Sequence, residues 1–98
     1  MNTYMIIIDL PTNLTKEFIA LIPKQRAKID ELMDEGKIIQ YALAIDRSKL
    51  WVTVAAKSEV KAREIISSFP LIDYMEPELI ALAFHNSIST ELPKLIMN

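Results

Sequence analysis

Arg26 is the residue of this 98-residue chain that packing alone explains least well. Ile22, Ile29 and Met33 share its helical spacing, so the pattern predicts an arginine inside an apolar stripe. Because an unpaired buried charge is costly, we expect an anion to meet the guanidinium, whose forked donors suit a substrate carboxylate. The alternative is that Arg26 extends to the rim, or pairs with a carboxylate of its own or a neighbouring chain.

His85 is the single histidine, and an imidazole can transfer a proton near neutral pH. Tyr4 and Tyr41 are predicted to lie toward the same end of a sheet as Arg26. Together with His85, these three residues could converge on the entrance of one pocket. Strand alternation places His85 on the opposite face, however, so it joins the group only if its strand twists or ends early. The alternatives are an interface or strand-end histidine and tyrosines that only satisfy their hydroxyl groups.

Asp9, Asp46 and Trp51 form a second group, predicted at the other end of the sheet. Two carboxylates could bind a metal or exchange protons, but no metal-binding spacing with the histidine accompanies them. We therefore favour a polar rim on a subunit interface. With Gly36 as the only glycine, the chain also has no glycine-rich phosphate loop. We expect neither a metal nor a cofactor.

Six segments must position these residues. Short runs rich in β-branched residues predict strands over residues 3–10, 37–45, 50–56 and 78–85. A first helix should begin after Thr15 and end at Gly36, continuing, kinking or restarting at Pro23. A second should begin after Ser58 and stop before Pro70. The order βαββαβ predicts an α+β, ferredoxin-like domain with a four-stranded antiparallel sheet and both helices on one side.

Alternation along these strands assigns two faces to the sheet. The bulkier face, expected beneath the helices, comprises Tyr4, Ile6, Ile8, Leu10, Ile39, Tyr41, Leu43, Ile45, Val52, Val54, Ile80, Leu82 and Phe84. The other comprises Thr3, Met5, Ile7, Asp9, Gln40, Ala42, Ala44, Asp46, Trp51, Thr53, Ala55, Leu79, Ala81, Ala83 and His85. This second face is too apolar to remain exposed to solvent. A second copy of the chain should cover it, which predicts a homodimer in the form of a dimeric α/β barrel.

Composition narrows the class of protein. We expect one domain over residues 1–98, with residues 86–98 as a C-terminal extension. An apolar share of 51% is high for a small chain and again favours self-association. A net charge of −2 argues against nucleic acid, and no apolar run is long enough for a membrane span. With no cysteine and no signal-peptide pattern, we expect a cytoplasmic protein.

Two stretches resemble the muconolactone isomerase family. The longer runs from Phe69-Pro70-Leu71-Ile72-Asp73-Tyr74-Met75 to Ala83-Phe84-His85-Asn86-Ser87, a turn and an apolar strand that ends on the histidine. The shorter, Leu32-Met33-Asp34-Glu35-Gly36, resembles the family's Leu-x-x-Glu-Gly helix end. Residues 40–56 depart from the enzyme's sequence. The family has the dimeric α/β-barrel fold, and the resemblance suggests a ring of dimers.

The resemblance implies a cofactor-free isomerase that moves a proton along an unsaturated lactone bearing a carboxylate. His85 matches the family's histidine and would shuttle the proton. From their predicted positions, Arg26 would hold the carboxylate and Tyr41 would donate to the oxygen that gains charge. Tyr4 and Trp51 would contact the substrate. Two other functions fit the sequence, namely a non-catalytic ligand-binding or assembly module, and a cofactor-free monooxygenase with an aromatic substrate.

Overall fold

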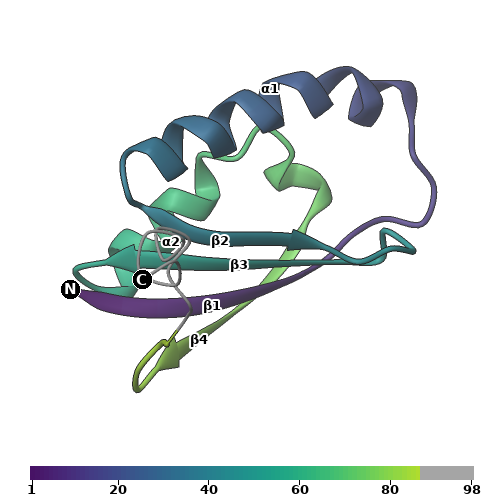
Figure 1. The fold of residues 1–98 in the computed structure, drawn as a ribbon. Helices are drawn as coiled ribbons and strands as arrows, with labels where there is room; N and C mark the ends of the chain where they lie inside the picture. Colours follow the sequence, from purple (N-terminus) through teal and green to yellow (C-terminus); the bar gives the residue numbers. More distant parts are fainter. Residues whose placement is uncertain (87–98) are drawn as a thin grey trace, which may run out of the picture.

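The computed structural model describes residues 1–86 and confirms the predicted α+β order βαββαβ (Figure 1). Its strands are β1 (Asn2–Asp9), β2 (Ile38–Leu43), β3 (Lys49–Ala56) and β4 (Glu76–Leu82). The helices are α1 (Lys16–Asp34) and α2 (Glu59–Ser67), and a short 3-10 helix, η1 (Ile72–Tyr74), precedes β4. The strands form one antiparallel sheet in the order β2-β3-β1-β4, with both helices on one face. Apart from Asn86, the expected C-terminal extension lies outside the described residues.

The ends of α1 form where the sequence predicts them. The Thr15 hydroxyl caps the first turn by accepting a hydrogen bond from the backbone N–H of Phe18 at 3.1 Å. At the other end Gly36 adopts a φ of 74°, a conformation that glycine takes without strain, and the Lys37 N–H donates to the Leu32 carbonyl. The helix continues through Pro23 as one element.

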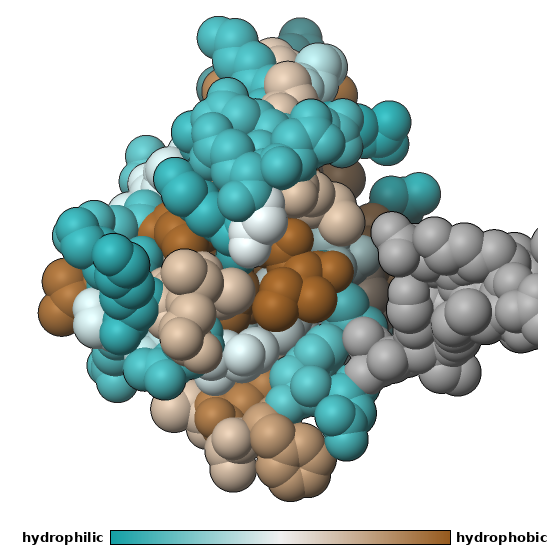
Figure 2. Space-filling model, turned by 60° about the vertical axis from the view of Figure 1, so that its left-hand side comes forward, coloured by the Kyte–Doolittle hydropathy of each residue, from teal (hydrophilic) through white to brown (hydrophobic). Residues whose placement is uncertain are grey.

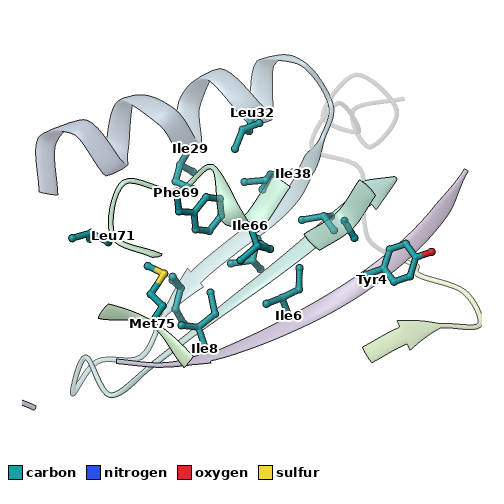
Figure 3. Packing of buried hydrophobic residues seen from close by; sticks show 14 of the residues in the cluster. Tyr4, Ile6, Ile8, Ile29, Leu32, Ile38, Ile66, Phe69, Leu71 and Met75 are labelled. Carbon is teal, nitrogen blue, oxygen red and sulfur yellow. The ribbon is translucent and has the colours of Figure 1, made fainter. Parts of the chain in front are cut away.

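The core lies between the sheet and the two helices (Figure 3). The residues Ile6, Ile8, Val52, Val54 and Phe69 are at most 1% exposed, so β1, β3 and the turn after α2 form its centre. Tyr4 lies at one end of this core, whereas Leu71 and Met75 lie at the other. Apolar burial of this kind is the main source of stability in a small domain.

Strand β2 departs from the predicted alternation. A bulge between Ile38 and Gln40 inserts one extra residue opposite β3. Ile38 therefore enters the core, and Ile39, expected beneath the helices, is 40% exposed. One inserted residue reverses the facing of every residue before it, so the sequence pattern alone placed Ile39 wrongly. The strand also ends at Leu43, which leaves Ile45 outside the sheet and fully exposed.

The sequence analysis assigned the residues of β4 to the wrong faces of the sheet. Leu79 and Ala81 pair with Ile6 and Tyr4, so they face the helices, whereas Ile80 and Leu82 face away. The strand also begins at Glu76 and ends at Leu82, earlier than the predicted residues 78–85. Apart from Glu78, residues 77–82 are all apolar and can lie on either face of a sheet. The alternation of polar and apolar residues therefore gave little information about which face each one occupies.

The face of the sheet that carries no helix is mostly apolar, and we call it the open face. It carries Met5 and Ile7 of β1, Trp51 of β3 and Ile80 of β4. Trp51 and Ile80 are 37% and 42% exposed. Such a face is typical of a surface that another sheet covers, and the predicted dimer stays a prediction. Neither helix within residues 1–86 is long and apolar enough to cross a membrane.

Candidate functional site

A pocket of about 180 Å³ opens between the first half of α1, the β2–β3 hairpin and the segment after α2. We call it the helix-side pocket. Most of its lining is apolar, and the polar lining residues are two arginines, a tyrosine and a glutamine. The lining residues are Leu10, Leu14, Phe18, Ile22, Gln25, Arg26, Tyr41, Leu43, Arg47, Leu50, Leu71 and Met75. Concave, mostly apolar sites with a few polar groups are those that bind small molecules.

Gln25 and Tyr41 form the inner polar part of the pocket. The Gln25 Nε2 donates to the Tyr41 hydroxyl at 3.4 Å, and the Gln25 Oε1 accepts from the Leu71 backbone N–H at 3.1 Å. Burial raises the pKa of Tyr41, while the Gln25 hydrogen bond and the charge of Arg26 oppose this change. The phenol therefore stays protonated over the physiological pH range, and it can donate a hydrogen bond to a ligand.

Two cationic side chains lie at the rim. Arg26 and Arg47 are both exposed, and neither forms an ion pair within residues 1–86. Arg47 holds a φ of 64°, a left-handed conformation that a non-glycine residue rarely adopts. The hairpin loop is fixed beside it, because the Asp46 Oδ1 accepts from the Ser48 backbone N–H at 3.0 Å and from its hydroxyl at 2.7 Å. These bonds lower the pKa of Asp46.

The apolar stripe of α1 runs beside Arg26 rather than through it. The buried residues are Phe18, Gln25, Ile29 and Leu32, and Met33 is 43% exposed. The expected stripe through Arg26 and Met33 was therefore one position out. Arg26 instead extends to the rim, where it still lines the pocket. Offsets from Phe18 through Ile22 to Gln25 would have revealed the stripe, but a glutamine does not look like a core residue.

The structure separates the other predicted site residues from this pocket. Tyr4 is 4% exposed at the opposite end of the core, where its hydroxyl accepts from the Asn2 Nδ2 at 3.4 Å (Figure 3). Trp51 faces the open side of the sheet. Of the five predicted site residues, only Arg26 and Tyr41 lie together. Sequence reasoning missed Gln25 and Arg47, because neither an amide on a helix nor an arginine in a hairpin loop carries a local pattern that marks a site.

His85 lies past the end of β4, next to the open face. Its Nε2 is 3.2 Å from the Gln40 Oε1, and the Thr53 hydroxyl donates to the same Gln40 oxygen at 3.4 Å. Gln40 pairs with Thr53 and points away from the helices, whereas its neighbour Tyr41 points toward them. The sheet therefore stands between His85 and the helix-side pocket.

Asp9 and Asp46, the two acidic residues of the second predicted group, have local structural partners. Asp9 and Lys49 form an ion pair, which raises the pKa of Lys49, and Asp46 stabilises the hairpin loop. No group of three or more histidine, aspartate or glutamate side chains suited to a metal occurs within residues 1–86.

A larger, open groove of about 610 Å³ lies at the other end of the helices, which Figure 2 shows from outside. Hydrophilic side chains surround exposed apolar ones there. Three of its lysines pair with glutamates, namely Lys28 with Glu31, Lys37 with Glu35 and Lys61 with Glu64. This mixed and internally neutralised surface offers no concentrated charge to a ligand, and surface pairs of this kind contribute little energy.

Comparisons with known proteins agree with this fold. Residues 4–88 match the sequence model of the muconolactone delta-isomerase family. The crystal structure of muconolactone isomerase superposes with a TM-score of 0.71 at 17% identity, over 88% of this chain and 93% of that one. The structure of MtbAldR superposes with a TM-score of 0.52 at 15% identity, over 90% of this chain and 58% of that one.

No curated protein matches the chain. The two structural likenesses establish the fold alone, because their identities are low. The family match is stronger evidence, since it covers most of the chain and includes both stretches that carry the resemblance in the sequence. The chain therefore belongs to the muconolactone delta-isomerase family.

Proposed function

We propose that the chain binds a small unsaturated carboxylic acid in the helix-side pocket and shifts a proton on it without a cofactor. The observation that carries the proposal is the pairing of an apolar pocket with two rim arginines. Neither Arg26 nor Arg47 has a carboxylate partner within residues 1–86. A ligand carboxylate would supply that partner, and charge-assisted hydrogen bonds to arginine are among the strongest polar contacts.

The lining suits a ligand with one charged and one apolar part. Phe18, Leu50 and Met75 offer apolar surface to a ring or short chain, while the arginines lie at the solvent side. Tyr41 also lines the pocket, and its hydroxyl proton can be donated to a ligand. An unsaturated lactone acid has this distribution of groups, and the family relationship makes it the first candidate.

The proposed reaction removes a proton from one ring carbon and adds one to another. Between these two steps, negative charge develops on the carbonyl oxygen of the lactone. The Tyr41 hydroxyl and the Arg26 charge would stabilise it there. The described lining contains no histidine, aspartate or glutamate to carry the proton. The group that carries the proton is therefore not among the described lining residues. His85 takes no step in this scheme, because it lies across the sheet.

Binding without turnover is the second candidate, and the absence of a general base from the described lining favours it. A cofactor-free monooxygenase has less support, since Trp51 does not line the pocket.

We also propose that two copies associate through their open faces. The exposed apolar residues Trp51 and Ile80 support this arrangement, and the helix-side pocket would remain outside the interface. Assembly of dimers into a larger ring stays a prediction.

The test uses an unsaturated lactone acid and its methyl ester, which has the same ring but no charge. Calorimetry should show that the protein binds the acid at least tenfold more tightly than the ester. Proton NMR in D₂O should then show deuterium entering the ring carbons as the double bond moves. Equal affinity for acid and ester would overturn carboxylate binding. Acid binding with no shift of the double bond would establish the second candidate in place of the isomerase.

A further inference from the structure

Gln25 is a buried polar side chain that holds three separate parts of the protein together. It lies on α1, is 4% exposed, and bonds to Tyr41 on β2 and to the backbone of Leu71 after α2. A buried amide is costly unless its oxygen and nitrogen both find partners, and both do here. The amide therefore requires two hydrogen-bond partners at this buried position, whereas an apolar residue would require none.

The Leu71 contact fixes which way the Gln25 amide points. A backbone N–H can only donate, so the Gln25 atom 3.1 Å from it must be the carbonyl oxygen Oε1. The other end of the amide, Nε2, then faces the Tyr41 hydroxyl and can only donate to it. An amide orientation is normally ambiguous between oxygen and nitrogen, and here the main chain removes the ambiguity.

This orientation determines what Tyr41 can offer to the pocket. One lone pair of its oxygen accepts from Gln25, and Arg26, the charge that acts on it, is also a donor group. Within residues 1–86, the bond with Gln25 is the one hydrogen bond that the Tyr41 hydroxyl makes. Its single proton is therefore left for an acceptor in the pocket.

We infer that the Gln25 amide, in the orientation that the Leu71 N–H imposes, leaves the Tyr41 hydroxyl proton free to be donated toward the pocket, so that the pocket selects ligands with an acceptor oxygen at that point. A lactone carbonyl or a carboxylate oxygen meets this requirement, whereas a hydrocarbon ring does not. The choice of ligand rests on the proposed function. The direction of the Gln25–Tyr41–ligand chain of donors rests only on the Leu71 contact.

Gln25→Glu tests this direction with almost no change in size. The glutamate can still accept from the Leu71 N–H, but its second oxygen now accepts a hydrogen bond from the Tyr41 hydroxyl, so that this proton is no longer available to a ligand. Gln25→Met is the matched control, because it keeps the shape and leaves the Tyr41 proton free. The probes are an unsaturated lactone acetic acid and cyclopentenylacetate, which carry the same carboxylate but differ in the ring acceptor.

We expect wild type and Gln25→Met to prefer the lactone acid by about tenfold, the usual worth of one hydrogen bond. Gln25→Glu should lose the preference, and any general weakening by its charge cancels in the ratio of the two dissociation constants. In a Tyr41→Phe background the preference should be absent, and Gln25→Glu should not change the ratio further. A preference retained in Gln25→Glu, or retained in Tyr41→Phe, would overturn the inference.

Ultraviolet titration of the phenols gives a second readout that needs no ligand. Subtracting the Tyr41→Phe curve isolates Tyr41, whose titration should move to higher pH in Gln25→Glu than in Gln25→Met. If wild type binds neither probe, the proposed function fails while this titration still decides the role of Gln25. An unchanged Tyr41 titration in Gln25→Glu contradicts the inference even if both probes bind.

Discussion

The helix-side pocket and the open face lie on opposite sides of one sheet, and they divide the polar groups between them. The pocket holds Arg26, Tyr41 and Gln25 among apolar walls, whereas the open face holds the His85–Gln40–Thr53 group beside exposed apolar residues. Gln40 and Tyr41 are neighbours on β2, yet they belong to different faces. One residue of register therefore decides which group takes part in which site.

The two regions differ in what they lack. Within the described residues, the pocket has cations and a donor but no general base, which suits binding and stabilisation of negative charge. The open face has a histidine beside exposed apolar residues such as Trp51 and Ile80, which suits contact with another sheet. We propose that ligand binding and self-association occupy separate faces. The following substitutions test that separation.

The largest effect is expected from a charge on the open face. Ile80→Lys should weaken self-association by about 3 kcal/mol or more, roughly a hundredfold, because each copy would bury an unpaired ammonium. Sedimentation or light scattering should change from dimer to monomer, while carboxylate affinity holds. Ile19→Lys places the same charge on an exposed position of α1 and should leave the dimer intact. Wild type that is monomeric at micromolar concentration would refute the interface itself.

The next effect concerns the rim. Arg26→Leu should weaken binding of the lactone acid by about 1.5 to 3 kcal/mol, tenfold or more, because a charge-assisted contact is lost. Thermal unfolding of the ligand-free protein should hold or improve, since no partner within residues 1–86 is left unpaired. Lys24→Leu removes an exposed charge from the same helix outside the pocket and serves as the control. A large loss of stability with binding unchanged would make Arg26 a structural residue.

A smaller effect should appear in alkaline unfolding. Burial raises the pKa of Tyr41 above that of an unfolded tyrosine, so the folded state keeps its proton after the unfolded state has lost it. The resulting stability is present below about pH 10 and is lost as the pH rises toward the folded pKa. Urea unfolding of Tyr41→Phe should therefore fall less steeply above pH 10 than that of wild type. Parallel slopes would mean that Tyr41 is not desolvated in solution.

His85→Gln should have the smallest effect on the pocket. Lactone-acid affinity and turnover should both stay within about twofold of wild type, because the sheet separates His85 from the ligand. A glutamine can still donate to Gln40, so assembly should also persist. A fall in turnover by two to four decades at unchanged affinity, about what one general acid–base group contributes, would instead place the proton step on the open face.

The sequence by itself determined the order of elements and most of the core. Thr15, Gly36 and Ser58 marked helix ends, and the predicted facing of β1 and β3 agrees with their register, which places Ile6 opposite Val52 and Tyr4 opposite Val54 in the core. These signals are local, and each is visible within a few residues of the chain. The two motifs near Gly36 and His85 were also enough to recognise the family that residues 4–88 match.

Only the tertiary structure decided how the polar residues divide between the two faces. The bulge in β2 and the register of β4 depend on pairing with strands distant in the sequence, and β4 is too uniformly apolar for alternation to fix it. Gln25 could not be recognised as a core residue because its partners, Tyr41 and the Leu71 N–H, come from other elements. A polar side chain belongs in a core only where the fold supplies its hydrogen bonds, and spacing along one helix does not reveal them.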